Sequence, residues 1–284
     1  MENTTTTNDH IETLATTLRG KRITALTGAG ISTESGIPDY RGPSGSLRTQ
    51  KPMTFAEFRG SERNRRRYWA RSSIGWRFID GRAPNAAHYA LATLEQAGVV
   101  TQLITQNVDR LHQRAGSRAV IELHGGLDRA VCMQCGTVHQ RAAVQRWIEA
   151  ANPQWQQRVA QFAPDGDAVL DERLEASFVV PPCPVCDGPI KPDVVFFGES
   201  VPKERVAASF AAVDASDVLL VLGSSLTVYS GFRFADYAVK QDRILAIVNR
   251  GTTRADDLAT IKIEADLTSA LPRLASLLVD RSLE

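Results

Sequence analysis

The run Ile23-Thr-Ala-Leu-Thr27, followed by Gly28-Ala-Gly30-Ile-Ser32, decides the fold class of this chain. A short apolar run that ends in closely spaced glycines predicts a buried strand turning into a helix. Two glycines there let backbone N–H groups approach a pyrophosphate at the helix N-terminus. However, Thr33 stands where dinucleotide-binding dehydrogenases have a third Gly or Ala, and no acidic residue clearly follows a second strand about 20 residues on. The stretch therefore predicts a nucleotide-binding α/β domain and disfavours a hydride-transfer enzyme.

Other short apolar runs, closed by Gly, Asn or Asp, extend the same pattern along the chain. They are expected as strands of a parallel sheet buried on both faces: 102–105, 194–197, Val218–Leu222, Ile244–Val248 and Ile261–Ile263. Helices are expected between several of them, at 86–97, 203–212 and Leu267–Val279. Alternating strands and helices predict a Rossmann-like, doubly wound parallel sheet.

Two regions do not fit this alternation and predict a smaller inserted lobe. We expect an N-terminal tail and first helix at 1–20 and a single catalytic domain at 21–284. Within that domain, the sheet would use about 21–42, 84–127 and 190–284, and the small lobe about 43–83 and 128–189. Residues 152–182 are expected as a long irregular excursion from the small lobe.

Charge and hydropathy exclude several classes of partner. The 33 Lys and Arg nearly balance the 32 Asp and Glu, giving a net charge of +1, so no overall field draws the chain to nucleic acid or anionic lipid. No apolar run reaches the roughly 20 residues that span a bilayer, and the first twenty residues lack a signal-peptide core. We therefore expect a cytoplasmic protein that contacts neither membrane nor nucleic acid, of undetermined oligomeric state and compatible with a monomer.

All four cysteines fall in two CxxC pairs, Cys132-Met-Gln-Cys135 and Cys183-Pro-Val-Cys186. Four thiolates with this spacing predict one closed, tetrahedral structural zinc site. Two disulfides, or unligated core cysteines, are the alternatives, and a cytoplasmic chain disfavours them. A zinc ribbon that binds nucleic acid is a further alternative, weakened because basic and aromatic residues do not cluster around the pairs.

Polar side chains follow two expected strands directly. Gln106, Asn107 and Asp109 come after 102–105, where burial would be costly unless they met a ligand, although a plain Asx turn is the alternative. His124 follows Ile121–Leu123 at an expected strand end and precedes two glycines, which leave its ring room to project into a cleft. The other histidines, His10, His88, His112 and His139, have no comparable context and are expected to be structural.

These stretches, read together, resemble the sirtuins in content and order from residue 21 to about 272. The matching motifs, besides the CxxC pairs, are Gly28-Ala-Gly-Ile-Ser-Thr-Glu-Ser-Gly-Ile-Pro-Asp-Tyr-Arg41, Thr105-Gln-Asn-Val-Asp109, Glu122-Leu-His-Gly125, Lys191-Pro-Asp-Val-Val-Phe-Phe-Gly-Glu199, Gly223-Ser-Ser225 and Val248-Asn-Arg-Gly251. Within the family, the chain is most similar to class II, the branch of the mitochondrial lipoamidase and ADP-ribosyltransferase. Four motifs support this placement: Asp39-Tyr-Arg41, Tyr68-Trp-Ala-Arg71, Ala163-Pro-Asp-Gly-Asp167 and Val228-Tyr-Ser-Gly231.

The resemblance implies an NAD-dependent protein lysine deacylase, a transferase that moves the acyl group of an acylated-lysine protein onto NAD-derived ADP-ribose and releases nicotinamide. It implies that His124 is the general base, that Asn107 is also catalytic, and that zinc is structural. The implied NAD contacts are Gly28, Ala29, Gly30, Ile31, Asp39, Tyr40, Arg41, Gln106, Asn107, Asp109, Gly223, Ser224, Ser225, Asn249, Arg250, Gly251 and Leu267. Residues 194–199 would offer an edge to which a substrate peptide adds as a strand.

Three points stay open: two alternative functions and the identity of the acyl group. Protein mono-ADP-ribosylation keeps NAD and changes the acceptor, whereas a non-enzymatic zinc adaptor would need neither His124 nor Asn107. The acyl group is the third question. Tyr68 and Arg71 have the Tyr-x-x-Arg spacing with which desuccinylase sirtuins bind an acyl carboxylate, and residues three apart share a helix face. An ordinary solvated Arg71, or a Trp69 whose bulk selects branched or long apolar chains, would remove that preference for acidic acyl groups.

Overall fold

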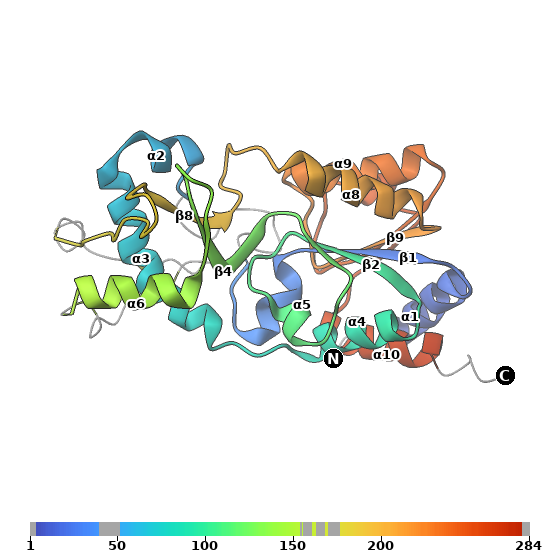
Figure 1. The fold of residues 1–284 in the computed structure, drawn as a ribbon. Helices are drawn as coiled ribbons and strands as arrows, with labels where there is room; N and C mark the ends of the chain where they lie inside the picture. Colours follow the sequence, from blue (N-terminus) through green and yellow to red (C-terminus); the bar gives the residue numbers. More distant parts are fainter. Residues whose placement is uncertain are drawn as a thin grey trace.

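A computed structural model describes residues 4–39, 52–153, 155, 161–162, 168–169 and 177–279. Its parallel-sheet lobe contains a six-stranded sheet in the order β11-β10-β9-β1-β2-β3, and all five strand pairings are parallel (Figure 1). The strands are β1 (Ile23–Thr27), β2 (Val100–Thr105), β3 (Val120–Glu122), β9 (Val218–Leu222), β10 (Ile244–Val248) and β11 (Ile261–Ile263). The strand order reverses between β1 and β9, the type of position where open α/β sheets bind ligands.

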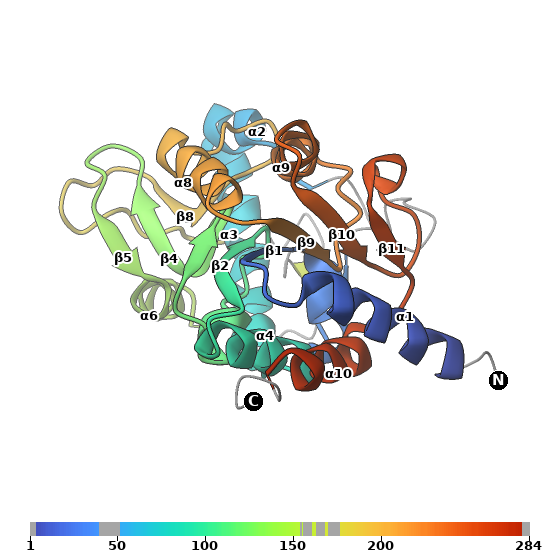
Figure 2. The same cartoon turned by 90° about the vertical axis from the view of Figure 1, so that its right-hand side faces the viewer.

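Helices cover both faces of this sheet. One face carries α1 (Thr4–Leu18), α4 (Ala86–Gln96) and α10 (Leu267–Val279), and the other carries α8 (Lys203–Asp214) and α9 (Tyr229–Lys240) (Figure 2). Every residue of the central strands β1 and β9 is buried, because both faces are covered. A capping box at Asn85 fixes the start of α4, where the side chain accepts from the N–H of Ala87 and His88.

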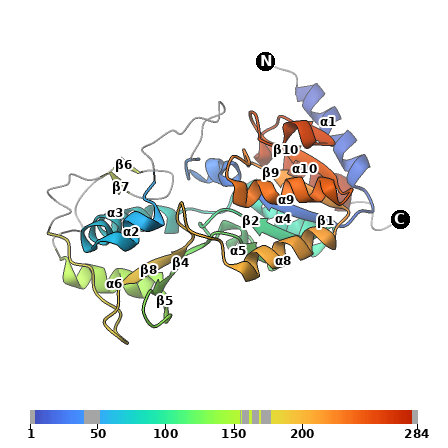
Figure 3. The ribbon, with the colours of Figure 1, turned by 90° about the horizontal axis from the view of Figure 1, so that it is seen from above.

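The small lobe lies beside the parallel-sheet lobe (Figure 3). Its antiparallel sheet has the order β5-β4-β8, formed by Val138–Gln140, Gly125–Cys132 and Ile190–Val194. Three helices accompany it: α2 (Phe55–Gly60), α3 (Glu62–Asp80) and α6 (Arg141–Ala151). Trp69 of α3 is fully buried in this lobe and donates from Nε1 to the backbone oxygen of Ile190 at 2.9 Å. The helix and the sheet therefore share one apolar core.

Shorter elements complete the described chain. These are the 3-10 helices η1 (Ala29–Ser35) and η3 (Asp256–Leu258), the helix α5 (Leu111–Arg114), and a two-stranded ribbon of β6 (Gln161–Phe162) and β7 (Ala168–Val169). None of the helices within the described ranges combines the length and the apolarity needed to cross a membrane.

The Rossmann-like sheet, its inserted lobe and most expected strands are confirmed. One expected strand is wrong: 194–197 is not part of the parallel sheet, since the strand there is β8, which ends at Val194 and pairs antiparallel with β4. A short apolar run indicates a buried strand without indicating which sheet it joins. Most of the expected excursion at 152–182, including the 163–167 motif, lies outside the described residues.

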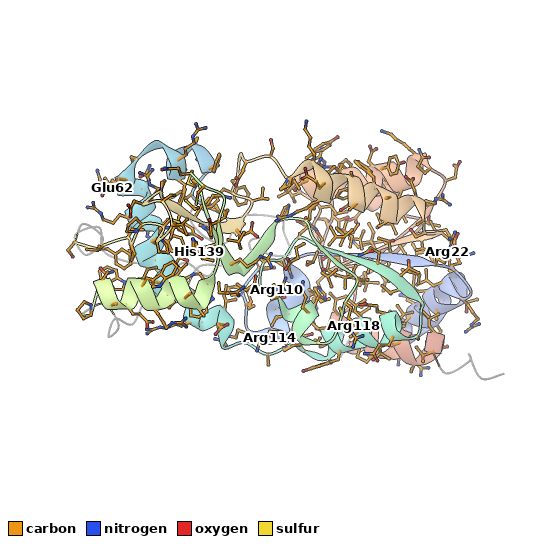
Figure 4. All side chains as sticks on the ribbon, in the orientation of Figure 1. Arg22, Glu62, Arg110, Arg114, Arg118 and His139 are labelled. Carbon is orange, nitrogen blue, oxygen red and sulfur yellow. The ribbon has the colours of Figure 1, made fainter. Side chains whose placement is uncertain are left out.

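The chain passes from one lobe to the other between β3 and β4. Gly125 there has φ 82°, and a Cβ on it would lie 2.0 Å from the backbone oxygen of Asp193. Only glycine fits this crossing, because the left-handed backbone and the contact with β8 both exclude a side chain. Figure 4 shows Arg110 at the junction of the two lobes and His139 within the small lobe.

Candidate active site

A cavity of about 1280 Å³ opens beyond the carboxyl ends of β1, β2 and β9, and residues of both lobes line it. The expected site residues that line it are Gly28, Ala29, Gly30, Ile31, Asp39, Tyr68, Gln106, Asn107, Asp109, His124, Gly223, Ser224, Ser225, Asn249, Arg250 and Leu267. Gly251 and Arg71 are not among its described lining residues, and Tyr40 and Arg41 lie outside the described part of the chain.

The glycines after β1 are required by contact between two loops. The N–H of Gly28 donates to Leu222 O at 3.1 Å, and that of Gly30 donates to Gly223 O at 2.9 Å. A Cβ on Gly28 would lie 2.7 Å from Cβ of Ser224, and one on Gly30 would lie 2.9 Å from Gly223 O. Both N–H groups therefore donate within the protein. Glycine is required here because the two loops touch, whereas the sequence analysis expected glycine to let the backbone approach a pyrophosphate.

Gln106 and Asn107, which follow β2, join the loops around them. Gln106 donates from Nε2 to Ser224 Oγ at 2.8 Å, and Asn107 donates from Nδ2 to Gly28 O and Ser32 Oγ, each at 3.1 Å. Protein groups therefore satisfy part of the hydrogen-bonding capacity that was expected to require a ligand. Both side chains still line the cavity, where these bonds hold them in fixed positions.

Asp109 is a partly buried carboxyl group with two donors from the protein. Its Oδ2 accepts from Ser32 Oγ at 2.7 Å and its Oδ1 accepts from the N–H of Leu111 at 2.9 Å. Burial raises the pKa of Asp109, and these hydrogen bonds oppose the rise. A ligand hydroxyl that reaches this carboxyl group meets an acceptor with little competition from water.

His124 lies between the two lobes, and both ring nitrogens have partners. Nδ1 lies 2.9 Å from the backbone oxygen of Gln106, and Nε2 lies 2.8 Å from Ser230 Oγ. Burial lowers the pKa of His124, the Gln106 contact raises it, and the positive charges of Arg233 and Arg205 lower it further. The net shift is downward, so the ring is neutral near pH 7 and can accept a proton.

At the other end of the cavity, the loop after β10 is held by its own side chains. Asn249 donates from Nδ2 to the backbone oxygens of Arg250 and Gly251, and Arg250 pairs with Asp266 at 2.6 Å. Gly251 thus shapes this loop through its backbone. Leu267 at the start of α10 adds an apolar contact to the cavity wall.

Of the two expected acyl-reading residues, only Tyr68 lines the cavity. Its ring packs against Phe58 and Phe196, with centroids 5.3 and 5.2 Å away. Trp69 is completely buried and is not among the described lining residues, and its ring packs against Tyr68 with the centroids 5.7 Å apart.

The four cysteines form one cluster in the small lobe. All four Sγ atoms lie within 4.8 Å of one another, with Cys132 to Cys186 at 3.5 Å and Cys135 to Cys183 at 3.9 Å. Tetrahedral zinc with Zn–S bonds of about 2.3 Å would place its sulfurs about 3.8 Å apart. The residues therefore fit a structural zinc ion. His139, expected to be structural, lies 3.3 Å from Cys183 Sγ.

Comparison with protein families matches residues 28–230 of this chain to the Sir2 family. That range begins at the first cavity glycine and includes His124 and all four cysteines. The chain belongs to the Sir2 family. It is 52% identical over 267 residues to NAD-dependent protein deacetylase 1 of Mycobacterium avium, covering 92% of this chain and 93% of that relative. It is 53% identical to an NAD-dependent protein deacetylase of Xanthomonas axonopodis pv. citri, covering 89% and 86% of the two chains.

Solved Sir2 structures have the same fold as this Sir2-family chain. A Sir2 complex with a p53 peptide and NAD+ gives a TM-score of 0.74 at 33% identity, covering 93% of this chain and 96% of that one. Sir2 bound to an acetylated peptide gives 0.70 at 30% identity, with the same coverage. The match includes both lobes, since it covers nearly the whole chain.

Several cavity residues of this Sir2-family chain were not singled out from its sequence. Ser32 bonds both Asn107 and Asp109, while Ser230 of α9 bonds His124 and the positive charge of Arg233 lowers the pKa of His124. Ser32 lies in the Gly28–Arg41 motif and Ser230 in the Val228-Tyr-Ser-Gly231 motif, but both motifs indicated the family or its branch without indicating these contacts. These partners are far apart in sequence, so spacing along the chain carries no information about them.

Proposed function

We propose that this protein is an NAD-dependent protein lysine deacylase, with deacetylation the reaction that its relatives' names favour. About half of its residues are identical to those of bacterial NAD-dependent protein deacetylases over most of the chain. When NAD and an acyl-lysine are bound, the reaction releases nicotinamide and moves the acyl group onto ADP-ribose.

The orientation of His124 carries this proposal. A backbone oxygen can only accept a hydrogen bond, so Gln106 O requires the proton of the neutral ring to be on Nδ1. The lone pair is then on Nε2, and His124 lines the cavity. A neutral imidazole with that lone pair is suited to remove a proton from a ribose hydroxyl, which is the role of a general base.

The remaining residues would bind and orient the two substrates. The loops at Gly28 and Gly223 would face the phosphates, Asn107 and Asp109 the nicotinamide end, and Ser225, Asn249 and Leu267 the adenosine end. Zinc would supply only structural stability, because four cysteine ligands leave no position for water or substrate. Its place in the small lobe fits that role.

The peptide side of the cavity offers a short backbone edge. Phe197 O already accepts from the N–H of Phe55 at 2.9 Å, and Glu199 Oε2 accepts from the N–H of Phe196 at the same distance. Phe197, Gly198 and Glu199 line the cavity. An acyl-lysine peptide that lies along this edge would direct its side chain toward Tyr68 and Phe196.

The test is to incubate the purified protein with NAD and a panel of acetyl-, succinyl-, glutaryl- and longer acyl-lysine peptides, and to identify products by mass spectrometry. The proposal expects equal yields of nicotinamide, free lysine and O-acyl-ADP-ribose. Mono-ADP-ribosylation would instead leave one ADP-ribose on a protein side chain. Absence of any NAD-dependent product with every peptide would overturn the enzymatic proposal.

A further inference from the structure

Ser230 and Gly231, at the start of α9, pack against His124 and against Gln106, whose backbone oxygen contacts the His124 ring. Gly231 approaches Gln106 so closely that a Cβ on it would lie 2.4 Å from Gln106 Oε1. Ser230, the preceding residue, places its Oγ 2.8 Å from Nε2 of His124. The backbone oxygen of the same Gln106 lies 2.9 Å from Nδ1 of the same ring. Ser230 and Gly231 thus place the first turn of α9 against the His124 ring and against the side chain of Gln106.

The two contacts of the ring determine which atom donates in each. Because Gln106 O must accept, Nδ1 of the neutral ring carries the proton and Nε2 has only a lone pair. The Ser230 hydroxyl therefore donates to Nε2. This is the atom, and the lone pair, that must receive a proton from a ribose hydroxyl if His124 is the general base.

We propose that Ser230 is a positioning residue for that base: its hydroxyl bonds Nε2 of His124 before NAD binds, and a ribose hydroxyl of NAD then replaces it there. This inference rests on the proposed function. Ser230 lines the cavity, so an arriving hydroxyl has access to the same place. Until then the imidazole has both nitrogens satisfied and one fixed orientation.

The charges around the ring favour the neutral form that this arrangement needs. Arg233 of α9 and Arg205 of α8 both act on His124 as positive charges. The N-terminus of the 12-residue helix α9, which carries Ser230, adds a partial positive charge. Two carboxylates on neighbouring elements are engaged by arginines: Glu122 of β3 pairs with Arg110 and Arg129, and Asp193 of β8 pairs with Arg129 and with Arg205 itself. A protonated ring would face three positive groups, so the serine acts as donor to the neutral ring.

This arrangement predicts a difference between two pH profiles. The profile of kcat/KM for NAD reports groups before NAD binds, whereas that of kcat reports groups afterwards. In Ser230→Ala, the neutral ring loses a donor, which raises the pKa of the base before NAD binds. The loss of one ordinary hydrogen bond from one protonation state moves a pKa by about half to one unit. The acid limb of kcat/KM should move upward by that amount, equal to a loss of about 3- to 10-fold on that limb, while the kcat limb stays in place.

Two further variants control this measurement. Ser230→Thr retains the hydroxyl and should restore the wild-type kcat/KM profile. Ser216→Ala removes another buried serine hydroxyl, which bonds Val213 O at 3.0 Å away from the cavity, and should leave both profiles unchanged. If neither limb moves in Ser230→Ala, the serine does not position the base. If both limbs move equally, Ser230 stays on Nε2 after NAD binds and the replacement step is wrong.

A measurement without turnover separates this inference from the proposed function. In protein labelled with ¹⁵N-histidine, His124 can be assigned with His124→Gln and titrated without NAD by NMR. The wild type should show the Nδ1–H tautomer, and Ser230→Ala should raise the pKa of His124 by about half to one unit. An unchanged His124 titration would overturn the contact even in an active enzyme, and a shifted one would support it even if no peptide were deacylated.

Discussion

Oε2 of Glu122, at the end of β3, lies 2.7 Å from Nη2 of Arg129 in β4, so an ion pair crosses the junction between the parallel-sheet lobe and the small lobe. Arg110 also pairs with Glu122, and Arg129 extends to Asp193 of β8 at 3.0 Å. Both arginines also reach Asp128. The network fixes the backbone on both sides of His124.

This network predicts an acid-sensitive contribution to stability. Burial acts to raise the pKa of Glu122, but hydrogen bonds from Arg129 and Arg110 outweigh it and hold the pKa below its usual value. Because the folded-state pKa is depressed, the stabilisation is complete above the unfolded value of about 4.3 and is lost as pH falls through the folded value. Glu122→Gln should cost about 1–3 kcal/mol near pH 7 and progressively less below pH 4.3.

Urea unfolding of wild type and Glu122→Gln across pH 3 to 7 measures this difference. Asp217→Asn is a matched control, since it removes a carboxylate from the exposed Arg22–Asp217 pair, which water and salt screen, so its cost should be much smaller than that of Glu122→Gln. A Glu122→Gln cost that is constant over the whole pH range would contradict the assignment.

Gly125→Ala should destabilise the protein far more than another glycine with the same backbone conformation. Gly136 also has positive φ, at 72°, but a Cβ there would meet no atom within 4 Å. Gly136→Ala should cost about 1–2 kcal/mol from the backbone alone, whereas Gly125→Ala adds overlap with Asp193 O and should cost at least about 3 kcal/mol. Equal costs in chemical denaturation would show that β8 moves away without penalty.

His124→Ala should reduce NAD-dependent deacylation by at least about 100-fold while leaving NAD affinity within a few-fold of wild type. The base acts after NAD has docked, and the two ring nitrogens contact Gln106 O and Ser230 Oγ, which are protein groups. Steady-state rates and calorimetric titration of NAD measure the two effects separately. His10→Ala, near the N-terminus, is the control. Retained turnover in His124→Ala would remove His124 from the mechanism.

Replacing Cys132 or Cys183 with Ser should release zinc and lower the melting temperature, because metal binding to such a site contributes folding free energy. Both thiols are buried, so an empty cluster also leaves polar groups in an apolar core. Val185→Ala changes an exposed side chain within a CxxC pair and should retain the metal. Zinc content by mass spectrometry and thermal unfolding check this, and a full zinc complement in either serine variant would rule out the four-cysteine site.

Arg71→Met tests the expected preference for acidic acyl groups. If Arg71 reaches an acyl carboxylate when substrate binds, the variant should lose about 10-fold or more in kcat/KM for glutaryl-lysine and little for acetyl-lysine. Arg66→Met, on the same helix, removes an arginine that pairs with Glu62 and should affect neither substrate. A wild type that favours acetyl-lysine, or equal losses on both substrates in Arg71→Met, would show that Arg71 does not bind an acyl carboxylate.

The sequence predicted the parallel sheet well because its central strands are short runs without charged residues, of which β9 and β10 are entirely apolar. Strands β1, β9 and β10 begin and end at the expected residues, since they are buried on both faces. The edge strand β11 also matches its expected range, although Lys262 interrupts it and it is only partly buried. Strand β8 was missed because Lys191, Pro192 and Asp193 interrupt its apolar pattern. Lys191 is nevertheless buried and pairs with Glu199 at 3.0 Å.

Contacts between distant residues were beyond reach from sequence alone. The hydroxyl on His124 comes from a residue 106 positions away, and the carbonyl on Trp69 comes from one 121 positions away. Arg141 is another case: it is almost fully buried and stacks over Trp69 and Trp76, although a charged residue at the start of a helix predicts exposure. Such pairs depend on how helices pack, which local periodicity does not encode.

The small lobe is assembled from two separate stretches of chain, one with α2 and α3 and the other with β4, β5, α6 and β8. A fragment cut from 125 to 194 would contain all four cysteines but lack Trp69, whose indole covers the sheet and bonds Ile190. Such a fragment would expose an apolar face and aggregate even with zinc bound. Domain swaps between relatives must therefore exchange both stretches together.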